Sequence, residues 1–599
     1  MMQMDQKRLM LAIGISVAIL LIFEIFVQGP QREVERARQA EIAAIQEAEE
    51  SASRAAAERS RLAATPGESG VREAARTTPD LRVRIDSPRI VGAINLTGAR
   101  LDDVTLRDYR ETIEPESDRV RVLSPRGTDQ PYFAQVGWTA AGDVRVPDVN
   151  TQWSTSSSTL GAGNPVTLSW DNGQGLRFEI IFTLDRDYMF RIEQRVINSA
   201  AEPVQLQTWG RIRREHTPQV AGYYILHEGM IGVVGGTLRE YTYKAGKDEA
   251  AKVIEGRAPG TIFQQAARGG WAGFTDKYWL TALVPDQSAE ATTGFRHISE
   301  GGKDFWQADV LNQAKEVRTG LAASSVTNLF VGAKEVHLLD RYEAALGIPN
   351  FDKAIDFGWF YFMTKPFFYA IDWLFKFTGN FGVAILIFTI FVKALFFPLA
   401  NKSYKAMAKM KALQPKMAEL KEKFGDDAQA MQREMMALYK KEKVNPVSGC
   451  LPMIIQIPVF FALYKVLVVT IEMRHAPFFG WIQDLSAPDP TNIFTLFGLI
   501  PFDPTVLPAV GPFLHLGIWP LLMGATMYFQ QKLNPAPPDP MQAKVFAFMP
   551  FIFTFMLGSQ PAGLVIYWAW NNLLSITQQW LIMKRQAPAV IPPPSTPQT

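Results

Sequence analysis

The sequence is poor in the residues that most often carry chemistry. Its 599 residues include one cysteine, Cys450, and six histidines. A single cysteine excludes an internal disulfide framework and a metal site built from several cysteines. No Walker motif for a nucleotide is present. Four histidines are scattered through the middle of the chain without the spacing of metal ligands: His216, His227, His297 and His337.

Acidic residues are absent from five apolar segments in the second half of the chain. A proton-coupled carrier usually needs carboxylates that titrate within the membrane, so this absence argues against such a carrier. The segments are residues 381–399, 451–471, 513–529, 545–557 and 562–583.

Apolar sequence is what the chain has in abundance, at 47% of its residues. The first apolar run, residues 9–27, follows Lys7 and Arg8, which are expected to stay in the cytoplasm. A cleaved signal peptide is the alternative, but the run exceeds the roughly 7–15 apolar residues of such peptides and no Ala-x-Ala site follows. We predict a transmembrane anchor over residues 1–28 and an Ala/Glu/Arg-rich spacer over residues 29–70.

Short runs of alternating apolar and polar residues follow, separated by Gly and Asp turns. Two runs flank Asn172-Gly173, which is a strong hairpin signal. The pattern predicts a large all-β sandwich over residues 71–345, on the far side of the membrane. Sandwiches also host sugar-binding and sugar-converting sites, so a sugar-modifying enzyme is an alternative, which would need an acid and a base paired in a cleft.

Residues 358–378 are aromatic but contain three charges. Thr364 is placed to cap a helix that begins near Pro366, and Asp372 and Lys376 would then share a face. A helix with one aromatic face and one charged stripe favours the membrane interface. The alternative is an ordinary amphipathic helix packed on the sandwich.

The anchor and the five later segments predict a multi-span α-helical membrane bundle of six transmembrane helices. Helix 2 is expected at residues 379–400 and helices 3–6 within 451–583, with both termini in the cytoplasm. Basic residues concentrate in the segments that this topology places inside. These inner segments are a helical hairpin at 401–450 and a Pro-rich tail at 584–599, whose last fourteen residues lack Lys and Arg.

Methionines recur at helical spacing in the predicted hairpin. One interpretation is that they pack on one another. The other is that some face water, because flexible thioethers suit a surface that meets many apolar partners. The methionines expected to make contacts are Met407, Met410, Met417, Met431 and Met435.

Lys393 lies inside the first of the five later segments, where a lysine costs about 2.5–3.5 kcal/mol. It is near enough to the end of the segment for its side chain to snorkel. Thr389, however, lies one turn away on the same face, Gln456 lies in the next segment, and the last segment has a polar stripe of Trp568, Asn571, Ser575 and Gln578. Such polar groups also serve as glue between helices. We interpret one cation among uncharged polar groups as a wet groove open to the cytoplasm.

Several long motifs carry a resemblance to a known family. The stretches "DLSAPDP", "EMMALYKKEKVNPVSGCLPMIIQIPVFFALY" and "DPMQAKVFAFMPFIFTF" resemble the YidC/Oxa family of membrane protein insertases, in its bacterial inner-membrane form. The resemblance covers nearly the whole chain. It implies a periplasmic β-sandwich, an interfacial helix, a cytoplasmic hairpin and a positively charged hydrophilic groove.

Function and partners are implied by the same resemblance. Family members insert nascent membrane proteins and act as chaperones, alone or with the Sec translocon, and contact ribosomes and membrane lipids. No cofactor, enzyme activity or direct nucleic-acid site is implied. Lys393 takes the place of the family's groove arginine, and Thr389 and the region of Tyr567 and Trp568 fall where the family contacts substrate.

Three features remain to be placed. A transporter or lipid flippase is the alternative function, although the coupling site it needs is missing from the sequence. Lys465 is a second cation in an apolar segment, and we expect it to snorkel to the outer interface. Residues 491–511 are long and apolar, either re-entrant or interfacial.

Overall fold

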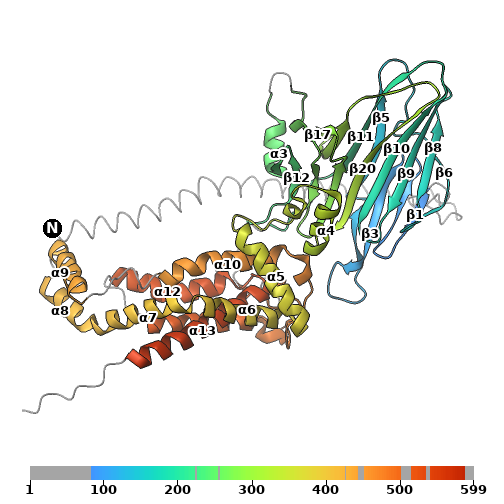
Figure 1. The fold of residues 1–599 in the computed structure, drawn as a ribbon. Coiled ribbons are helices and arrows are strands. Elements are labelled where there is room, and N and C mark those ends of the chain that lie inside the picture. The colour runs from blue at the N-terminus through green and yellow to red at the C-terminus, as the bar shows by residue number, and fades with distance from the viewer. Residues whose placement is uncertain are drawn as a thin grey trace, which may run out of the picture.

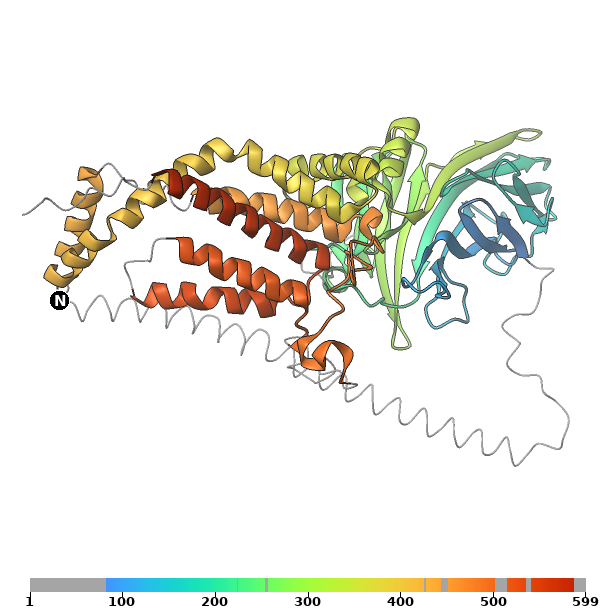
Figure 2. The ribbon, with the colours of Figure 1, turned by 90° about the horizontal axis from the view of Figure 1, so that it is seen from below.

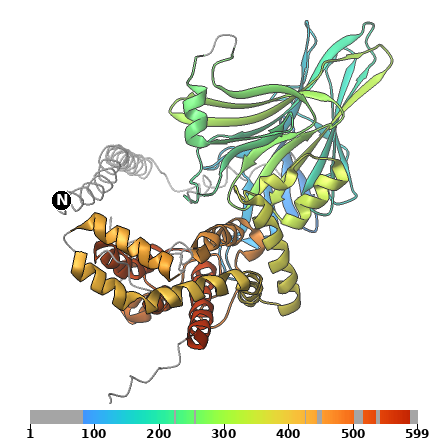
Figure 3. The same cartoon turned by 60° about the vertical axis from the view of Figure 1, so that its left-hand side comes forward.

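The computed structural model describes residues 82–222, 225–253, 257–424, 427–442, 451–500, 514–534 and 540–586. The predicted anchor, the spacer, Cys450 and the tail from residue 587 lie outside these ranges. The described chain forms a β-sandwich and a helical bundle, with two helices, α4 and α5, where the two bodies meet (Figures 1 and 3). The helices are α4 (Val336–Leu346) and α5 (Tyr361–Thr378).

Two largely antiparallel sheets make the sandwich, which confirms the all-β prediction. The larger sheet has eleven strands in the order β14 (Thr261–Arg268), β17 (Glu290–Glu300), β18 (Lys303–Asn312), β11 (Val204–Arg214), β5 (Tyr132–Ala140), β3 (Arg100–Arg110), β2 (Ile90–Asn95), β1 (Arg82–Asp86) and β7 (Thr159–Leu160), with β19 (Lys315–Val317) on β11 and β4 (Arg119–Leu123) on β3. The smaller sheet has nine strands in the order β13 (Thr237–Thr242), β12 (Gly229–Val234), β15 (Trp271–Thr275), β16 (Trp279–Pro285), β20 (Ala322–Ala333), β10 (Met189–Asn198), β9 (Leu176–Leu184), β8 (Val166–Asp171) and β6 (Ser154–Thr155). Between β13 and β14 lies the short helix α3 (Tyr243–Ala250).

The predicted hairpin turn lies between β8 and β9, which pair antiparallel. The side-chain oxygen of Asn172 accepts hydrogen bonds from the backbone N–H groups of Gln174 and Leu176 at 2.7 and 3.0 Å. Gly173 has a φ of 75°, which favours glycine. The turn therefore forms for the local reasons that the sequence indicated.

The bundle contains the apolar segments and the predicted hairpin. The hairpin helices α8 and α9 lie at the end of the bundle that is far from the sandwich (Figure 2). The bundle helices are α6 (Phe381–Leu395), α7 (Phe397–Ala412), α8 (Gln414–Phe424), α9 (Ala428–Lys441), α10 (Leu451–Val469), α11 (Ile518–Leu533), α12 (Pro540–Met556) and α13 (Ala562–Gln586), with a 3-10 turn at Ile493–Gly498 in the outer loop.

Within the described ranges, no helix on its own combines the length and the hydropathy of a membrane span. The helices α6 and α7 reach these values together, but their axes bend by 68°. Two shorter apolar helices are found at Gln456–Val469 and Ala543–Met556.

Two helix boundaries differ from the sequence predictions. The segment expected to be straight to residue 399 breaks at Phe396, because Pro398 has no N–H to bond the Ala394 carbonyl and stands in the first turn of α7. The expected first hairpin helix is likewise divided at Leu413, which ends α7 two residues before Pro415.

The start of α5 was also predicted wrongly. The helix begins at Tyr361, and the backbone N–H of Thr364 already donates to the Phe360 carbonyl at 2.8 Å. The Thr364 hydroxyl therefore bonds back to that carbonyl, at 3.0 Å, and does not cap a later helix. The expected pair of Asp372 and Lys376 does form, at 2.7 Å.

Polar contacts join the sandwich to the outer end of α10, at a place we call the joint. Lys465 Nζ lies 2.8 Å from Asp356 Oδ2 and also donates to the Ile225 carbonyl. The Glu472 carboxylate accepts from the Val336 N–H at 2.8 Å. Lys465 thus lies at the end of α10 nearest the sandwich, where it forms an ion pair with Asp356; we had expected it to snorkel.

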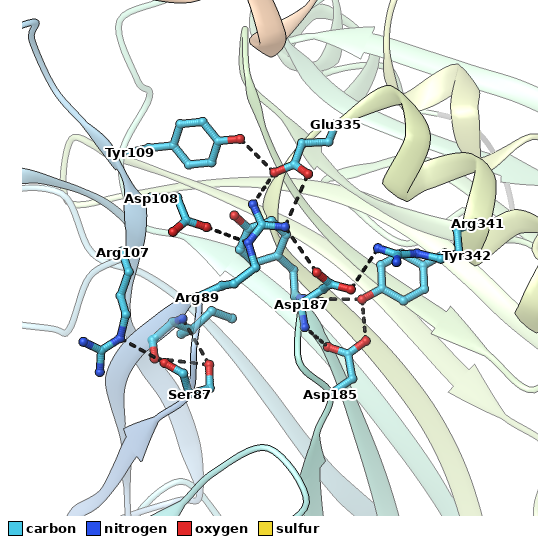
Figure 4. A network of polar contacts seen from close by, with 12 residues as sticks. Ser87, Arg89, Arg107, Asp108, Tyr109, Asp185, Asp187, Glu335, Arg341 and Tyr342 are labelled. Atoms are coloured by element: carbon cyan, nitrogen blue, oxygen red, sulfur yellow. Dashed lines mark hydrogen bonds and ion pairs between the residues drawn. The ribbon is translucent and has the colours of Figure 1, made fainter. Parts of the chain in front are cut away.

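An arginine network holds α4 on the sandwich beside the joint (Figure 4). Arg89 pairs with Asp108 at 2.6 Å, with Asp187 at 3.2 Å and with Glu335, which directly precedes α4. Its guanidinium also lies 4.2 Å from the centre of the Tyr188 ring. Three carboxylates around one half-buried cation fix the position of α4, whose first N–H binds Glu472.

Candidate functional site

The predicted groove residues meet in a hollow between α6, α7, α10 and α13. The hollow has a volume of about 440 Å³. Three of the predicted residues line it: Lys393, Gln456 and Gln578. The rest of the lining is Val392, Phe396, Leu399, Ala400, Tyr404 and Val459.

Lys393 extends toward α13 in this hollow. Its Nζ donates to the hydroxyl of Ser575 at 2.8 Å, and Ser575 donates in turn to the Asn571 carbonyl at 2.7 Å. Tyr404 also interacts with the Ser575 hydroxyl. No carboxylate of the described residues forms an ion pair with Lys393, so its charge has only neutral partners.

Amide side chains near the cation have hydrogen-bonding groups that lack partners among the described residues. Gln456 donates to the Tyr567 hydroxyl at 2.7 Å, which links α10 to α13. The Asn571 Oδ1 and Gln578 Nε2 atoms are buried and make no hydrogen bond with any described residue. Buried polar groups normally have partners. The hollow therefore suits water or the polar groups of a guest.

Five predicted residues lie outside the lining of the hollow: Thr389, Tyr567, Trp568, Asn571 and Ser575. Thr389 is buried, and its hydroxyl donates to the Ile385 carbonyl at 2.7 Å, within its own helix. Trp568 packs against Phe460 and Phe553, with ring centres 4.6 and 5.6 Å away. Thr389 and Trp568 support the walls of the hollow by packing.

Tyr404 is a lining residue that sequence analysis missed. It lies on α7, beyond the break at Phe396, and is buried against Met407 and Ile582. A straight helix through residues 381–412 would give a different direction to its side chain. The bend, which turns Tyr404 toward Ser575, was the missing information.

The polar residues of α13 divide into two groups. On the side away from the hollow, Asn572 donates to the Thr526 hydroxyl at 3.3 Å and Gln579 donates to Asn534 Oδ1 at 3.2 Å. These contacts join α13 to α11 and its end. The alternative that polar side chains hold neighbouring helices together therefore applies to this second face of α13.

The predicted hairpin methionines mostly pack inward. Met407 packs on Tyr404, while Met410, Met417 and Met435 pack around Leu413 and Tyr439. Met431 is half-buried, and Met436 is 53% exposed. The interpretation that the methionines pack inward therefore holds for the described part of the hairpin. Among the described hairpin methionines, Met436 is the one that faces outward.

Apolar side chains are exposed on the outer faces of α10 and α12. Large apolar side chains that are exposed together on a helix face are expected where the helix faces lipid or an apolar partner. The exposed side chains are Ile457 and Phe461 on α10, and Val545, Phe548, Phe551, Ile552 and Phe555 on α12.

Comparisons with known proteins agree with this architecture. The model of the family described as "YidC periplasmic domain" matches residues 82–370, and that described as "60Kd inner membrane protein" matches residues 373–589. A membrane protein insertase YidC from Granulibacter bethesdensis is 52% identical over 588 residues, covering 97% of this chain and 98% of that protein. The chain belongs to the YidC family of membrane protein insertases.

Other YidC proteins show the same extent of similarity. The YidC of Beijerinckia indica is 50% identical over 599 residues and covers 98% of this chain and 96% of its own length. A crystal structure of an active YidC insertase with its first transmembrane domain resolved is 18% identical, covers 84% of this chain and 92% of its own, and has a TM-score of 0.35. The two family models and the insertases of Granulibacter bethesdensis and Beijerinckia indica confirm the predicted family and the predicted insertase function. The family descriptions give an inner-membrane protein with a periplasmic domain.

The sandwich also has a polar hollow, of about 270 Å³. Its lining includes Trp138, Gln194, Thr208, Gln313 and Lys315. None of the described residues that line it is Asp, Glu or His. The acid and base that a sugar-modifying enzyme needs are therefore not brought together in this hollow.

Proposed function

We propose that this insertase receives the polar flank of a substrate in the hollow around Lys393 and releases the attached apolar helix into lipid. The observation that carries the proposal is the contact of Lys393 with a hydroxyl in place of a carboxylate. A cation without a counter-charge favours a negative group that enters beside it. The substrates are nascent membrane proteins.

The polar flank is the obstacle in this reaction. An apolar helix of about 20 residues is stable in lipid, but each acidic residue of its flank costs about 2.5–3.5 kcal/mol at the membrane centre. Lys393, with Gln456 and Gln578, offers charge and hydrogen bonds part of the way across. The flank then crosses a shorter apolar distance, and no covalent bond is made or broken.

The apolar part of the substrate needs a different surface. We assign this role to the exposed faces of α10, which also lines the hollow, and of α12. Side chains such as Phe461 and Phe551 give apolar contact without fixed hydrogen bonds, so the substrate can leave sideways into lipid.

Two further partners belong to this proposal. The hairpin α8–α9 lies at the end of the bundle away from the periplasmic domain, where a ribosome in the cytoplasm would reach it (Figure 2). We therefore expect deletion of residues 414–441, which spares Met407, to slow co-translational insertion while post-translational insertion continues. Equal rates with and without α8–α9 would contradict this role. We also propose that the protein cooperates with the Sec translocon. The same proposal gives the protein six membrane spans, with both termini in the cytoplasm.

The test is site-specific photo-crosslinking during insertion. A photo-reactive residue at Gln578, which lines the hollow, is compared with one at the neighbouring exposed Thr577. Ribosome-bound chains of a single-span protein should crosslink to position 578 while the flank is short, and lose this crosslink as the chain lengthens. Crosslinks at 577 alone, with insertion intact, would place the path elsewhere. An ion-dependent flux of solute or lipid through the purified protein would support the transporter or flippase alternative.

A further inference from the structure

The outer face of the larger sheet carries a group of arginines. On β11, the side chains of Arg211 and Arg213 point outward, whereas Ile212 between them is buried in the core. Arg211 is paired in register with Gln135 on β5, and Gln135 is paired with Arg100 on β3. Arg126 lies just before β5. We call Arg100, Arg126, Arg211 and Arg213 the arginine cluster.

Aromatic rings lie beneath these guanidinium groups. The guanidinium carbons of Arg100 and Arg126 are 5.6 and 5.0 Å from the centre of the Phe133 ring. Phe133 is fully buried although it points to the outer face, so these side chains cover it. Arg211 lies over Trp209 in the same way, at 5.2 Å. The rings hold the guanidinium groups in place by cation–π contacts.

Acidic residues do not balance the charge of the cluster. Glu215 is shared by Arg126, at 2.5 Å, and Arg213, at 3.3 Å. Asp102 lies 3.7 Å from Arg100, but it also pairs with Arg82 outside the cluster. The cluster therefore has a surplus of positive charge.

Arg211 is the member of the cluster that has only neutral partners among the described residues. It donates to Gln135 Oε1 at 2.7 Å, and no carboxylate of the described chain forms an ion pair with it. Its Nε atom is buried and has no hydrogen-bond partner among the described residues. Burial, and then the neighbouring Arg213 and Arg126, lower the pKa of Arg211 to about 10. A charged group that is buried to this degree normally has a counter-charge.

We propose that the arginine cluster is a binding site for a phosphate group. A guanidinium presents a planar fork of donors that matches a phosphate, and several forks can share its oxygens. A phosphate dianion would neutralise the surplus charge and accept hydrogen bonds from several guanidinium groups of the cluster. A carboxylate carries one negative charge and two oxygens, so it would neutralise less of the surplus charge than a phosphate dianion.

The test uses the full chain in nanodiscs of phosphatidylcholine, at constant ionic strength, with inorganic phosphate as the probe. Phosphate should raise the melting temperature of the periplasmic domain and broaden its own phosphorus NMR signal. Arg211→Gln should weaken phosphate binding about tenfold or more. The matched control is Arg191→Gln, an exposed arginine on the smaller sheet, which should bind as the unmodified chain does.

Three results would overturn the proposal. They are no saturable phosphate binding by the full chain, equal binding by the Arg211→Gln and Arg191→Gln variants, and equal stabilisation by acetate at the same ionic strength. Melting without phosphate checks that Arg211→Gln folds, and Arg100→Gln replaces it if it does not. If phosphatidylglycerol in the nanodisc competes with phosphate, the natural phosphate is a lipid headgroup, and if it does not, the source is soluble.

Discussion

The joint and the hollow surround half-buried cations in opposite ways. At the joint and beside it, Lys465 pairs with Asp356, and Arg89 is surrounded by Asp108, Asp187 and Glu335. In the hollow, Lys393 has only the Ser575 hydroxyl and its neutral neighbours. The two regions lie at different levels of the same bundle, and α10 contributes to both.

The difference separates cations that hold the fold together from a cation that is able to receive a charged group of a substrate. A cation that already pairs with a carboxylate of the fold has little attraction left for a second negative group. Removing either partner of the pair leaves an uncompensated charge. A cation with neutral partners keeps its attraction for a guest. The comparison therefore predicts that changes at Lys393 alter insertion and that changes at the joint alter stability.

The largest effect is expected from Lys393→Met, which removes the charge but keeps the length of the side chain. Insertion of a substrate with an acidic flank into proteoliposomes should fall about tenfold or more, because the flank loses its counter-charge. Lys402→Met removes an exposed lysine of α7 and is the matched control. A loss that is equal in the two variants would break the comparison.

A second change makes the hollow resemble the joint. Gln578→Glu puts a carboxylate in the lining of the hollow that contains Lys393. The pair should occupy the cation and reduce insertion of acidic-flank substrates about fivefold. Gln578→Met, which is neutral, should have a much smaller effect. Full activity of Gln578→Glu would show that Lys393 need not be free.

A third change acts on the joint. Lys465→Met leaves the Asp356 carboxylate without its partner, and this residue is 19% exposed. We expect the melting temperature to fall by about 5 °C or more, and the preference for acidic over neutral flanks to stay the same. Asp356→Asn in the same chain should restore part of the stability. A changed flank preference would mean that the joint also shapes the hollow.

The smallest effect concerns Glu472 and pH. Burial raises the pKa of Glu472 to about 8, compared with about 4.3 in an unfolded chain. Between these values the folded state binds more protons, so stability falls as the pH rises. Glu472→Gln keeps an acceptor for the Val336 N–H and should melt a few degrees above the unmodified chain near pH 8, with little difference below pH ~5. A difference that does not depend on pH would exclude this ionisation.

The sequence predicted those parts of the fold that depend on local period. The alternation of apolar and polar residues predicted the sandwich, and Asn172-Gly173 predicted a turn. The polar stripe on α13 predicted Ser575, which contacts Lys393, and Gln578, which lines the hollow. The helical period alone does not show which polar face of α13 is turned to the hollow. Ser575 contacts Lys393, whereas Asn572 joins α13 to α11. That distinction depends on which helices pack on each side.

What the sequence did not predict arises from contacts between distant segments. Lys465 and Asp356 are more than 100 residues apart, and no local pattern pairs them. Tyr404 enters the hollow because α7 bends away from α6 at Phe396. The arginine cluster comes from β3, β11 and the segment before β5, so it becomes visible only when β3, β5 and β11 are side by side.

The central claim, that a cation without a counter-charge receives the acidic flank, is tested most directly by a charge series at one position. Purified chains with Lys, Met or Glu at position 393 insert two substrates that differ only in an Asp or Asn flank, in liposomes without a membrane potential. We predict that the ratio of Asp-flank to Asn-flank insertion falls steadily from Lys through Met to Glu. A ratio that is the same in all three chains would contradict the account, because the charge of residue 393 would then have no effect on the flank.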